Sequence, residues 1–509
     1  MNLSTSTALP GLEALLDFIR AFASQVFSYR GILTFIVLLF AVFTKRVYFA
    51  PISQIPGPRF ASFSRLWHIR QILKGHQNLS LIEQHDKHGQ FVRISHSEVS
   101  VSHPDGIKQL FLAPVPKGDW YRVFCFPDYR YTTPISLTEP RDKNERSRYL
   151  ASGFLLHNVL KSEDFIDENV GKYAANNDAM DLAMFFTYVA FDITGEVIFS
   201  KPFGFLDKGE DVRGAIAMNV GLEFYLSIFG FYRWVHWLVA NPLVTWTQLV
   251  PMGHLYHTAA GALDERRKNP DARFDLSAHW FKGLAKAEKE NSPHFNMKYL
   301  VAAASSNVGA GSDTVSCGLQ SFFYHMLRHP DAMKRAQAEI EDACRQGRCT
   351  QRVVSYEDAV QLPYLQACIK EALRIFGPVP MGLPRMAPKG GITIGDHFFP
   401  EGVTLSISPW VYHYSTEFWG PDAREFNPDR WLADDIASRE KYFIPWGMGY
   451  ASCPGQHIAR IQLSKISATV VRDYEIRQVD PKQEWTWSAY FTVVPHDWPV
   501  YVTRRGRLT

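Results

Sequence analysis

The sequence predicts a mainly α-helical protein with smaller β-sheets, preceded by an N-terminal transmembrane helix. Residues 296–328 form a long, apolar-rich helical run, and residues 456–472 show helical spacing directly after a glycine-rich loop. Apolar and polar residues alternate in residues 91–101, which predicts a β-hairpin. Residues 383–408 and 485–502 are also typical of short strands joined by Gly and Pro turns.

Composition and charge narrow the possible classes of protein. The 509 residues are 46% hydrophobic, 14% aromatic and 21% charged, which is enough apolar material for a large core. Length alone suggests about three domains. However, no linker, charge run or repeat interrupts the chain after residue 60, so we expect one catalytic domain over residues 60–509. A net charge of +3 is too balanced to indicate a nucleic-acid partner.

The cysteines do not form a disulfide framework. No C-x-x-C pair occurs, and the spacing is scattered, which favours reduced thiols in a cytosolic compartment. The six cysteines are Cys125, Cys317, Cys344, Cys349, Cys368 and Cys453.

The first 50 residues predict a membrane anchor. The apolar block at residues 31–44 is shorter than the ~20 residues that span a bilayer, so we extend the span upstream to residues 22–44. This extension includes Arg30, whose long side chain can reach the interface. Lys45 and Arg46 place the rest of the chain on the cytoplasmic side of a single-pass membrane protein. A buried core helix is the alternative.

A proline-rich hinge is expected at residues 51–59, between the anchor and the catalytic domain. The run Pro-Ile-Ser-Gln-Ile-Pro-Gly-Pro begins at Pro51, and its prolines stop a helix and favour an extended backbone.

Cys453 is the principal candidate metal ligand. It lies in a loop with Gly447 and Gly449, which tolerate positive φ, and directly precedes the helix predicted from Gln456. The positive end of a helix favours a thiolate. One cysteine is too few for a zinc site or an iron–sulfur cluster, whereas a single thiolate suits haem iron. A buried free cysteine is the alternative.

A second candidate site interrupts the long apolar helix at residues 310–314. Gly311 destabilises a helix interior by about 1 kcal/mol relative to Ala, and Asp313 is awkward to bury. A local opening at Gly311 would admit a diatomic ligand, and Asp313 and Thr314 would deliver protons to it. The alternative is a helix kink without catalytic function.

With these motifs in order, the chain resembles the cytochrome P-450 monooxygenases, the haem-thiolate family. The loop before Cys453 resembles the haem-binding loop of that family, with Trp446 where Phe is usual and Ala451 where a basic residue is usual. The residues 310–314 resemble its oxygen-activating motif. The resemblance is closest to the microsomal type and to the fungal, pisatin-demethylase-like branch. It implies a fold that holds haem b between a long central helix and the cysteine-loop helix.

The resemblance also implies which residues hold the haem. Cys453 would ligate the iron, while Trp446 and Gly447 belong to the loop beneath it. Because Ala451 carries no charge, Arg385 is the first choice to neutralise a haem propionate. In the basic run at residues 141–150, Arg146 or Arg148 would be a second such cation; a solvated helix face is the alternative.

Glu371, Arg374 and Arg430 are expected to form a buried structural network. The Glu-x-x-Arg motif is weak alone, because Glu145/Arg148 and Glu210/Arg213 match it equally well. Glu371 is selected by its position between the oxygen motif and the cysteine loop, and by Arg430 in the run Pro-Asp-Arg-Trp.

The implied activity is insertion of one atom of O2 into a lipophilic small molecule. No G-x-G-x-x-G fingerprint opens a βαβ unit, so electrons are expected from a separate NADPH-dependent flavoprotein reductase. The expected setting is the endoplasmic reticulum membrane with a cytoplasmic catalytic domain. The expected substrate is a terpenoid, polyketide or alkaloid of fungal secondary metabolism. A haem-thiolate isomerase or dehydratase and a non-enzymatic haem carrier are the alternatives.

Aromatic segments are candidates for the walls of the substrate site. Residues 116–124 form an aromatic loop, and residues near Phe491 are expected at the tip of a C-terminal β-structure. The aromatic residues of 214–246 belong either to the core or to a surface that enters the lipid.

Overall fold

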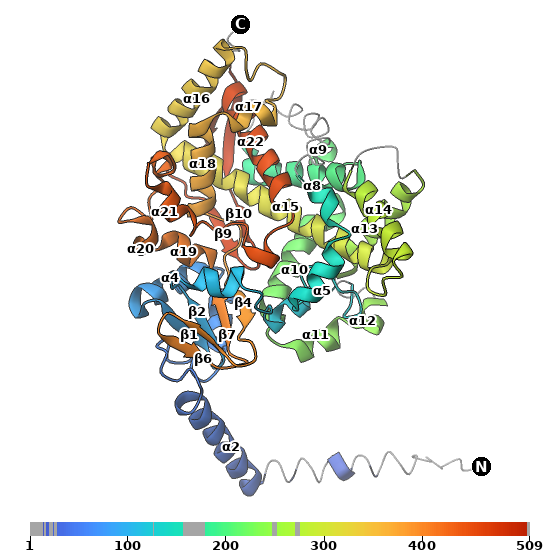
Figure 1. Ribbon diagram of the computed structural model, residues 1–509, viewed down its shortest axis with the longest axis vertical. Coiled ribbons are helices and arrows are strands. Elements are labelled where there is room, and N and C mark those ends of the chain that lie inside the picture. Colours follow the sequence, from blue (N-terminus) through green and yellow to red (C-terminus); the bar gives the residue numbers. More distant parts are fainter. Residues whose placement is uncertain are drawn as a thin grey trace, which may run out of the picture.

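A small β-rich region lies at one end of the helical body, and the N-terminal helix projects from that end (Figure 1). The structure is a computed structural model that describes residues 28–125, 127–155, 179–246, 252–269 and 275–505, together with Ala14, residues 17–19 and Ser24.

Helices make up most of the body. The first half contains α2 (Tyr29–Tyr48), α3 (Leu66–Leu73), α4 (Gln77–His88), α5 (Pro140–Ser147), α8 (Leu182–Phe199), α9 (Phe205–Lys208), α10 (Ala215–Phe229), α11 (Arg233–Val239) and α12 (Pro242–Trp246). The second half contains α13 (Met252–Arg267), α14 (Leu276–Lys289), α15 (Met297–Arg328), α16 (Pro330–Arg345), α17 (Tyr356–Val360), α18 (Pro363–Ile375), α19 (Pro409–Tyr414), α20 (Thr416–Trp419), α21 (Ile436–Glu440) and α22 (Gln456–Asp473). Short turns of helix are η1 (Ile107–Leu112), η2 (Asp119–Val123), η3 (Ala151–Phe154), η5 (Val212–Gly214), η6 (Pro428–Leu432) and η7 (Gly449–Ala451).

The strands form small sheets. They are β1 (Phe91–Ser95), β2 (Glu98–Val101), β3 (Met180–Asp181), β4 (Leu383–Met386), β5 (Ile392–Ile394), β6 (His397–Phe399), β7 (Thr404–Ile407), β8 (Tyr474–Gln478), β9 (Thr486–Ala489), β10 (Val493–His496) and β11 (Pro499–Arg504). The largest sheet has the order β1-β2-β7-β4, in which only β2 and β7 are parallel. The predicted hairpin at residues 91–101 is therefore confirmed as β1 and β2.

The central helix α15 organises the body. It crosses the middle of the molecule and packs against α8, α13, α18 and α22 (Figure 1). The side chain of Asn296 caps its start by accepting a hydrogen bond from the Tyr299 amide, and the helix ends before Pro330. Most of its residues are buried, as expected for a helix covered on several sides.

The helix α2 is the candidate membrane span. Three apolar helices among the described residues are long enough to cross a bilayer, but α8 is largely covered by protein and Val212–Phe229 partly so. Of these three candidate spans, only α2 has no buried residue. It begins at Tyr29 and ends at Tyr48, so the helix continues beyond the expected limit of residue 44, and Lys45 and Arg46 form its last turn. Of the expected residues 22–27, only Ser24 is described.

The proline-rich segment is packed onto the β-sheet. Ile52 and Ile55 are buried in the same hydrophobic cluster as β2 and β7. Arg93 of β1 donates from its guanidinium to the carbonyl of Arg46 in α2, at 2.6 Å, and its amide donates to the carbonyl of Pro56, at 2.7 Å. These contacts fix the direction in which α2 leaves the body.

Candidate active site

The loop that carries Cys453 is closed by a short backbone contact. The Cys453 amide donates to the carbonyl of Trp446 at 2.7 Å. Gly447 and Gly449 have φ of 61° and 64°, in the left-handed region that favours glycine. A Cβ at Gly449 would lie 1.9 Å from the carbonyl oxygen of Phe111, so only glycine lets η1 pack directly on the loop.

The protein environment does not by itself make Cys453 a thiolate. Burial raises the pKa of the thiol, although the amides of Gly455 and Gln456 and the ammonium of Lys143 act in the opposite direction. The predicted effect of the helix N-terminus is thus present but smaller than the effect of burial. A metal ion that binds the sulfur would displace its proton.

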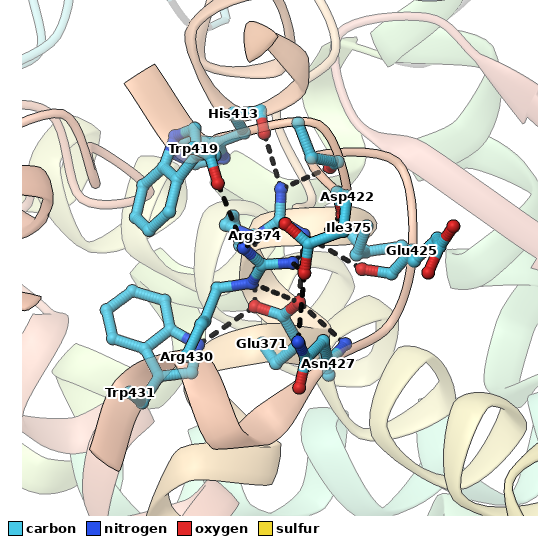
Figure 2. Close-up of polar contacts among 12 residues, drawn as sticks. Glu371, Arg374, Ile375, His413, Trp419, Asp422, Glu425, Asn427, Arg430 and Trp431 are labelled. Atoms are coloured by element: carbon cyan, nitrogen blue, oxygen red, sulfur yellow. Dashed lines mark hydrogen bonds and ion pairs between the residues drawn. The ribbon is translucent and has the colours of Figure 1, made fainter. Parts of the chain in front are cut away.

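Glu371 and Arg374 of α18 form a fully buried ion pair with Arg430 of η6 (Figure 2). Arg374 contacts both carboxylate oxygens of Glu371, at 2.8 and 2.9 Å, and Arg430 donates to the same carboxylate at 2.9 Å. The indole of Trp431 and the amide of Asn427 also donate to Glu371. The predicted network is therefore confirmed, and this carboxylate has hydrogen-bond donors on both oxygens.

The same network reaches the cysteine loop through His413. Arg374 donates to the carbonyl of His413 at 2.5 Å, and the His413 ring accepts from the amide of Ile444 at 3.0 Å (Figure 2 shows the Arg374 contact). Because burial lowers the pKa of His413 to about 3, the ring is neutral and its Nε2 is free to accept this bond. The position of the loop before Cys453 therefore depends on the Glu371 network.

The central helix presents an exposed patch in its buried middle. Ala310 is exposed, and Gly311 and Thr314 are half-buried, although they lie midway along α15. The Thr314 hydroxyl donates to the carbonyl of Ala310 at 2.7 Å. No break is present at Gly311, so the expected local opening is not seen. Instead, a Cβ there would approach Thr194 of α8 to 3.2 Å, which gives glycine a packing role.

Asp313 lies on the buried side of this turn, next to Thr314 in sequence. It is 8% exposed and accepts a hydrogen bond from the side-chain amide of Asn219 on α10. Burial raises the pKa of Asp313 to about 6, whereas bonds from Asn219 and Glu223 lower it. An acid beside a hydroxyl is therefore present where the sequence predicts it, but the acid points toward α10.

Arg385 lies in a group of three cations, of which Arg385 and Lys117 are buried and Lys143 is half-buried. Arg385 is 2% exposed, and its guanidinium donates to the carbonyl of Pro384 and to the hydroxyl of Tyr121. The guanidinium also lies over the ring of Phe111, and its Nε is unbonded. Lys117 pairs with Arg385 across a β-bridge and donates to the carbonyl of Ile135. Burial and the two neighbouring cations hold the pKa of Lys117 well below its usual range.

Lys143 completes the group, and the sequence-based interpretation missed it. Its ammonium donates to the carbonyl of Tyr450, directly before Ala451. Burial, with Arg385 nearby, lowers the pKa of Lys143 to about 8. Lys143 belongs to the basic run at residues 141–150, and this run is the feature of the sequence that indicates a cation here. The sequence does not show how α5 is rotated, and this rotation decides that Lys143, and not an arginine of the run, reaches Tyr450.

The two arginines chosen from that run lie elsewhere. Arg148 is more than half exposed and forms an ion pair with Glu290 at 2.7 Å, beyond the end of α14. Arg146 donates to Thr132 and lies over the ring of Tyr299. The structure brings Arg385 together with Lys143 and Lys117, and does not bring Arg148 to this group.

Aromatic residues from distant segments pack together. Phe491, in the turn between β9 and β10, packs against Phe124 with ring centroids 4.9 Å apart and against Trp120 at 5.8 Å. Trp120 and Phe124 come from the predicted aromatic loop at residues 116–124 and are buried.

The aromatic segment at residues 214–246 divides between the core and the surface. Leu222 and Leu226 of α10 are buried, whereas Trp234, Trp237 and Leu238 of α11 are each more than half exposed. A cluster of large apolar side chains at the surface is typical of contact with a membrane or a partner.

One cavity lies apart from these residues. It has a volume of about 630 Å³ and is lined from α8, α9 and α13 by side chains that include Phe191, Phe205 and Thr258. None of the predicted site residues lines it.

A family model described as cytochrome P-450 matches residues 56–497. The chain belongs to the cytochrome P-450 family. A cytochrome P-450 monooxygenase of Aspergillus flavus is 28% identical over 494 residues, which cover 90% of this chain and 94% of the relative. Pisatin demethylase of Fusarium vanettenii is 26% identical over 470 residues, covering 88% of each chain. A P-450 monooxygenase of Emericella nidulans is 26% identical over 496 residues, covering 93% and 98%.

These relatives support the predicted class. They are fungal and are named as monooxygenases or, in one case, as a demethylase. The chain is therefore an oxidoreductase of the P-450 monooxygenase type, and the predicted similarity to pisatin demethylase is confirmed.

The residues present fit the haem that the family implies. Cys453 is the one described cysteine in a glycine-rich loop before a helix, and no cluster of His, Cys, Asp and Glu among the described residues suits another metal site. Lys117, Lys143 and Arg385 form no ion pair with a described carboxylate, so an anion from outside the chain would satisfy them. The propionates of a haem are such anions.

Replacing Glu371 tests the network that positions the loop. In Glu371→Gln, Arg374 and Arg430 lose their shared carboxylate in a fully buried site, so we expect the free energy of unfolding to fall by about 3–5 kcal/mol. Urea unfolding followed by circular dichroism measures it. Glu145→Gln is the matched control, since Glu145 has the same spacing to an arginine but is exposed on α5; it should change the free energy by less than about 0.5 kcal/mol. Equal effects of both variants would contradict this account.

Replacing Lys143 tests the cation group. Loss of one charge-assisted hydrogen bond, worth roughly 1.5–3 kcal/mol, should weaken haem binding by about 10- to 100-fold. We expect Lys143→Met and Arg385→Met to lower the haem-to-protein ratio after gel filtration. Arg141→Met, on the same helix but exposed, should retain haem. Full haem retention by Lys143→Met would show that Lys143 does not replace the charge missing at Ala451.

Proposed function

We propose that this protein inserts one atom of O2 into a C–H bond of a lipophilic small molecule in a fungal secondary-metabolite pathway. The observation that carries this proposal is that three features occur together in a chain of the P-450 family: a half-buried loop cysteine, a helix turn with Asp313 and Thr314, and three cations without a described carboxylate partner. The relatives that share nearly the whole chain are fungal monooxygenases, which supports the same setting.

Each group of residues has a distinct task in this proposal. Haem b, when bound, supplies the redox chemistry of oxygen activation, and electron donation from the Cys453 thiolate favours O–O cleavage. Lys143, Lys117 and Arg385 hold the propionates, and Trp446 and Gly447 shape the loop beneath the thiolate. Thr314 holds a hydroxyl at the exposed patch of α15, and Asp313 holds or releases a proton beside it.

The substrate contacts proposed here are apolar. Phe491, Trp120 and Phe124 join in one aromatic wall, which suits a terpenoid, polyketide or alkaloid skeleton. The exposed Trp234 and Trp237 suit an approach of the site to the membrane, from which such a substrate would enter.

The proposed partners lie outside the chain. An NADPH-dependent flavoprotein reductase supplies the electrons. The candidate span α2, with Lys45 and Arg46 in its last turn, supports a single-pass anchor in the endoplasmic reticulum membrane with residues 60–509 in the cytoplasm.

The test is incorporation of labelled oxygen. The full chain, a reductase, NADPH and ¹⁸O2 are incubated with an extract of lipophilic fungal metabolites, and products are identified by mass spectrometry. We expect a product that gains one labelled atom and is absent with Cys453→Ala. A product that forms without label and without NADPH would contradict monooxygenation and favour a haem-thiolate isomerase. Thr314→Ala should reduce product per NADPH, whereas a non-enzymatic haem carrier would form no product at all.

A further inference from the structure

A second acid is buried against Asp313. Glu223 of α10 is 5% exposed and its carboxyl is hydrogen-bonded to that of Asp313. Thr492, in the turn between β9 and β10, donates its hydroxyl to Glu223. Asn219, one helical turn before Glu223, donates to Asp313. Four polar side chains from α10, α15 and the turn thus meet in an otherwise apolar interior.

The two carboxyls are in contact with no cation to balance them. The thiol of Cys317 on α15 is close enough to be affected by both carboxyls, and it is neutral because burial raises its pKa. Two neighbouring helices also contact this turn of α15 through uncharged side chains. They are Thr194 of α8, near Gly311, and Leu255 of α13, near Gly309. Among the described residues, no charged group outside the pair changes the pKa of either carboxyl. Two contacting carboxylates cannot both ionise easily, so the pair holds one proton.

The contacts favour the proton on Glu223, because the side-chain amide of Asn219 donates to Asp313 and so favours the ionised form of Asp313. Burial and the neighbouring Asp313 raise the pKa of Glu223 well above its usual value, whereas burial raises the pKa of Asp313 only to about 6. At neutral pH Glu223 is therefore a neutral acid that donates to the Asp313 carboxylate. The proton leaves as the pH rises above the raised pKa of Glu223, and the pair then carries two repelling charges.

We propose that Glu223 is a positioning residue that supplies the proton which Asp313 delivers toward Thr314. In this step an O–H bond of Glu223 breaks and an O–H bond of Asp313 forms, so that the negative charge moves from Asp313 to Glu223. Monooxygenation consumes protons because one oxygen atom leaves as water, and solvent restores the proton to Glu223 after each turnover. The inference rests on the role proposed above for Asp313 and Thr314.

A purely structural role would use the same contacts. The pair ties α10 to α15, and Thr492 ties both to the β9–β10 turn beside Phe491. Glu223→Gln separates the two roles, because the amide can still donate to Asp313 but has no acidic proton to give. A structural role alone predicts that Glu223→Gln forms as much product per NADPH as the natural protein.

The shared proton is tested by infrared spectroscopy of the full-length haem-loaded protein, without substrate or reductase. We expect a carboxylic-acid C=O band of one group at neutral pH that is absent in Glu223→Gln and disappears as the pH is raised. Thr492→Val, which keeps the carboxyl and removes its hydroxyl donor, should shift the band and not abolish it. Spectra of the natural protein and Glu223→Gln without this difference would overturn the proposal. A failed search for the substrate does not affect this measurement.

Proton supply is tested by coupling, with the substrate found by oxygen labelling. Loss of a general acid typically lowers rates by about 10²–10⁴-fold, so we expect Glu223→Gln to lower product per NADPH by roughly tenfold or more. Released hydrogen peroxide should rise, while the thermal midpoint and substrate affinity stay unchanged. Coupling equal to that of the natural protein would overturn the role of Glu223 even if monooxygenation itself is established.

Discussion

The carboxylate of Glu371 accepts the hydrogen bonds on which the position of the Cys453 loop depends. It accepts hydrogen bonds from Arg374, Arg430 and Trp431 in a site with no solvent exposure. Such a charge is tolerated only when its partners are fixed, because an unpaired buried ion is strongly destabilising. Arg374 donates to the carbonyl of His413, and the His413 ring accepts from the amide of Ile444, which lies in the segment leading to Cys453.

The rule that a buried charge needs a fixed partner also separates structural sites from ligand-binding sites. Around Glu371 each buried charge finds its partner within the chain, so the network is structural. Near Tyr450, the cations Lys117, Lys143 and Arg385 form no ion pair with a described carboxylate, and an anion from outside the chain would relieve their mutual repulsion. Glu223 and Asp313 are a third case. Among the described residues no cation neutralises these two carboxyls, and the pair keeps one proton instead.

The features predicted well from sequence were those carried by local patterns. The helix over residues 296–328 follows from its apolar run and its Asn and Pro boundaries, and the loop of Cys453 follows from its glycines. The fold class and the family were predicted because these local motifs occur in a fixed order along the chain.

The features missed depend on how distant elements meet. Lys143 and Arg148 lie in the same basic run, and only the packing of α5 decides which of them faces Tyr450. Glu223 carries no local signal, because an acid on an aromatic helix becomes informative only when Asp313 is known to lie opposite. The close approach of Thr194 to Gly311 also depends on how α8 packs against α15, so the sequence does not show this contact.

The central claim is that Cys453 ligates a haem through its sulfur. The most direct measurement is the absorption spectrum of the reduced protein with carbon monoxide. A thiolate ligand displaces the Soret band to long wavelength, and we predict this band for the natural chain and its replacement by a shorter-wavelength band in Cys453→His. A displaced band that persists in Cys453→His, or no haem band in the natural chain, would contradict the account.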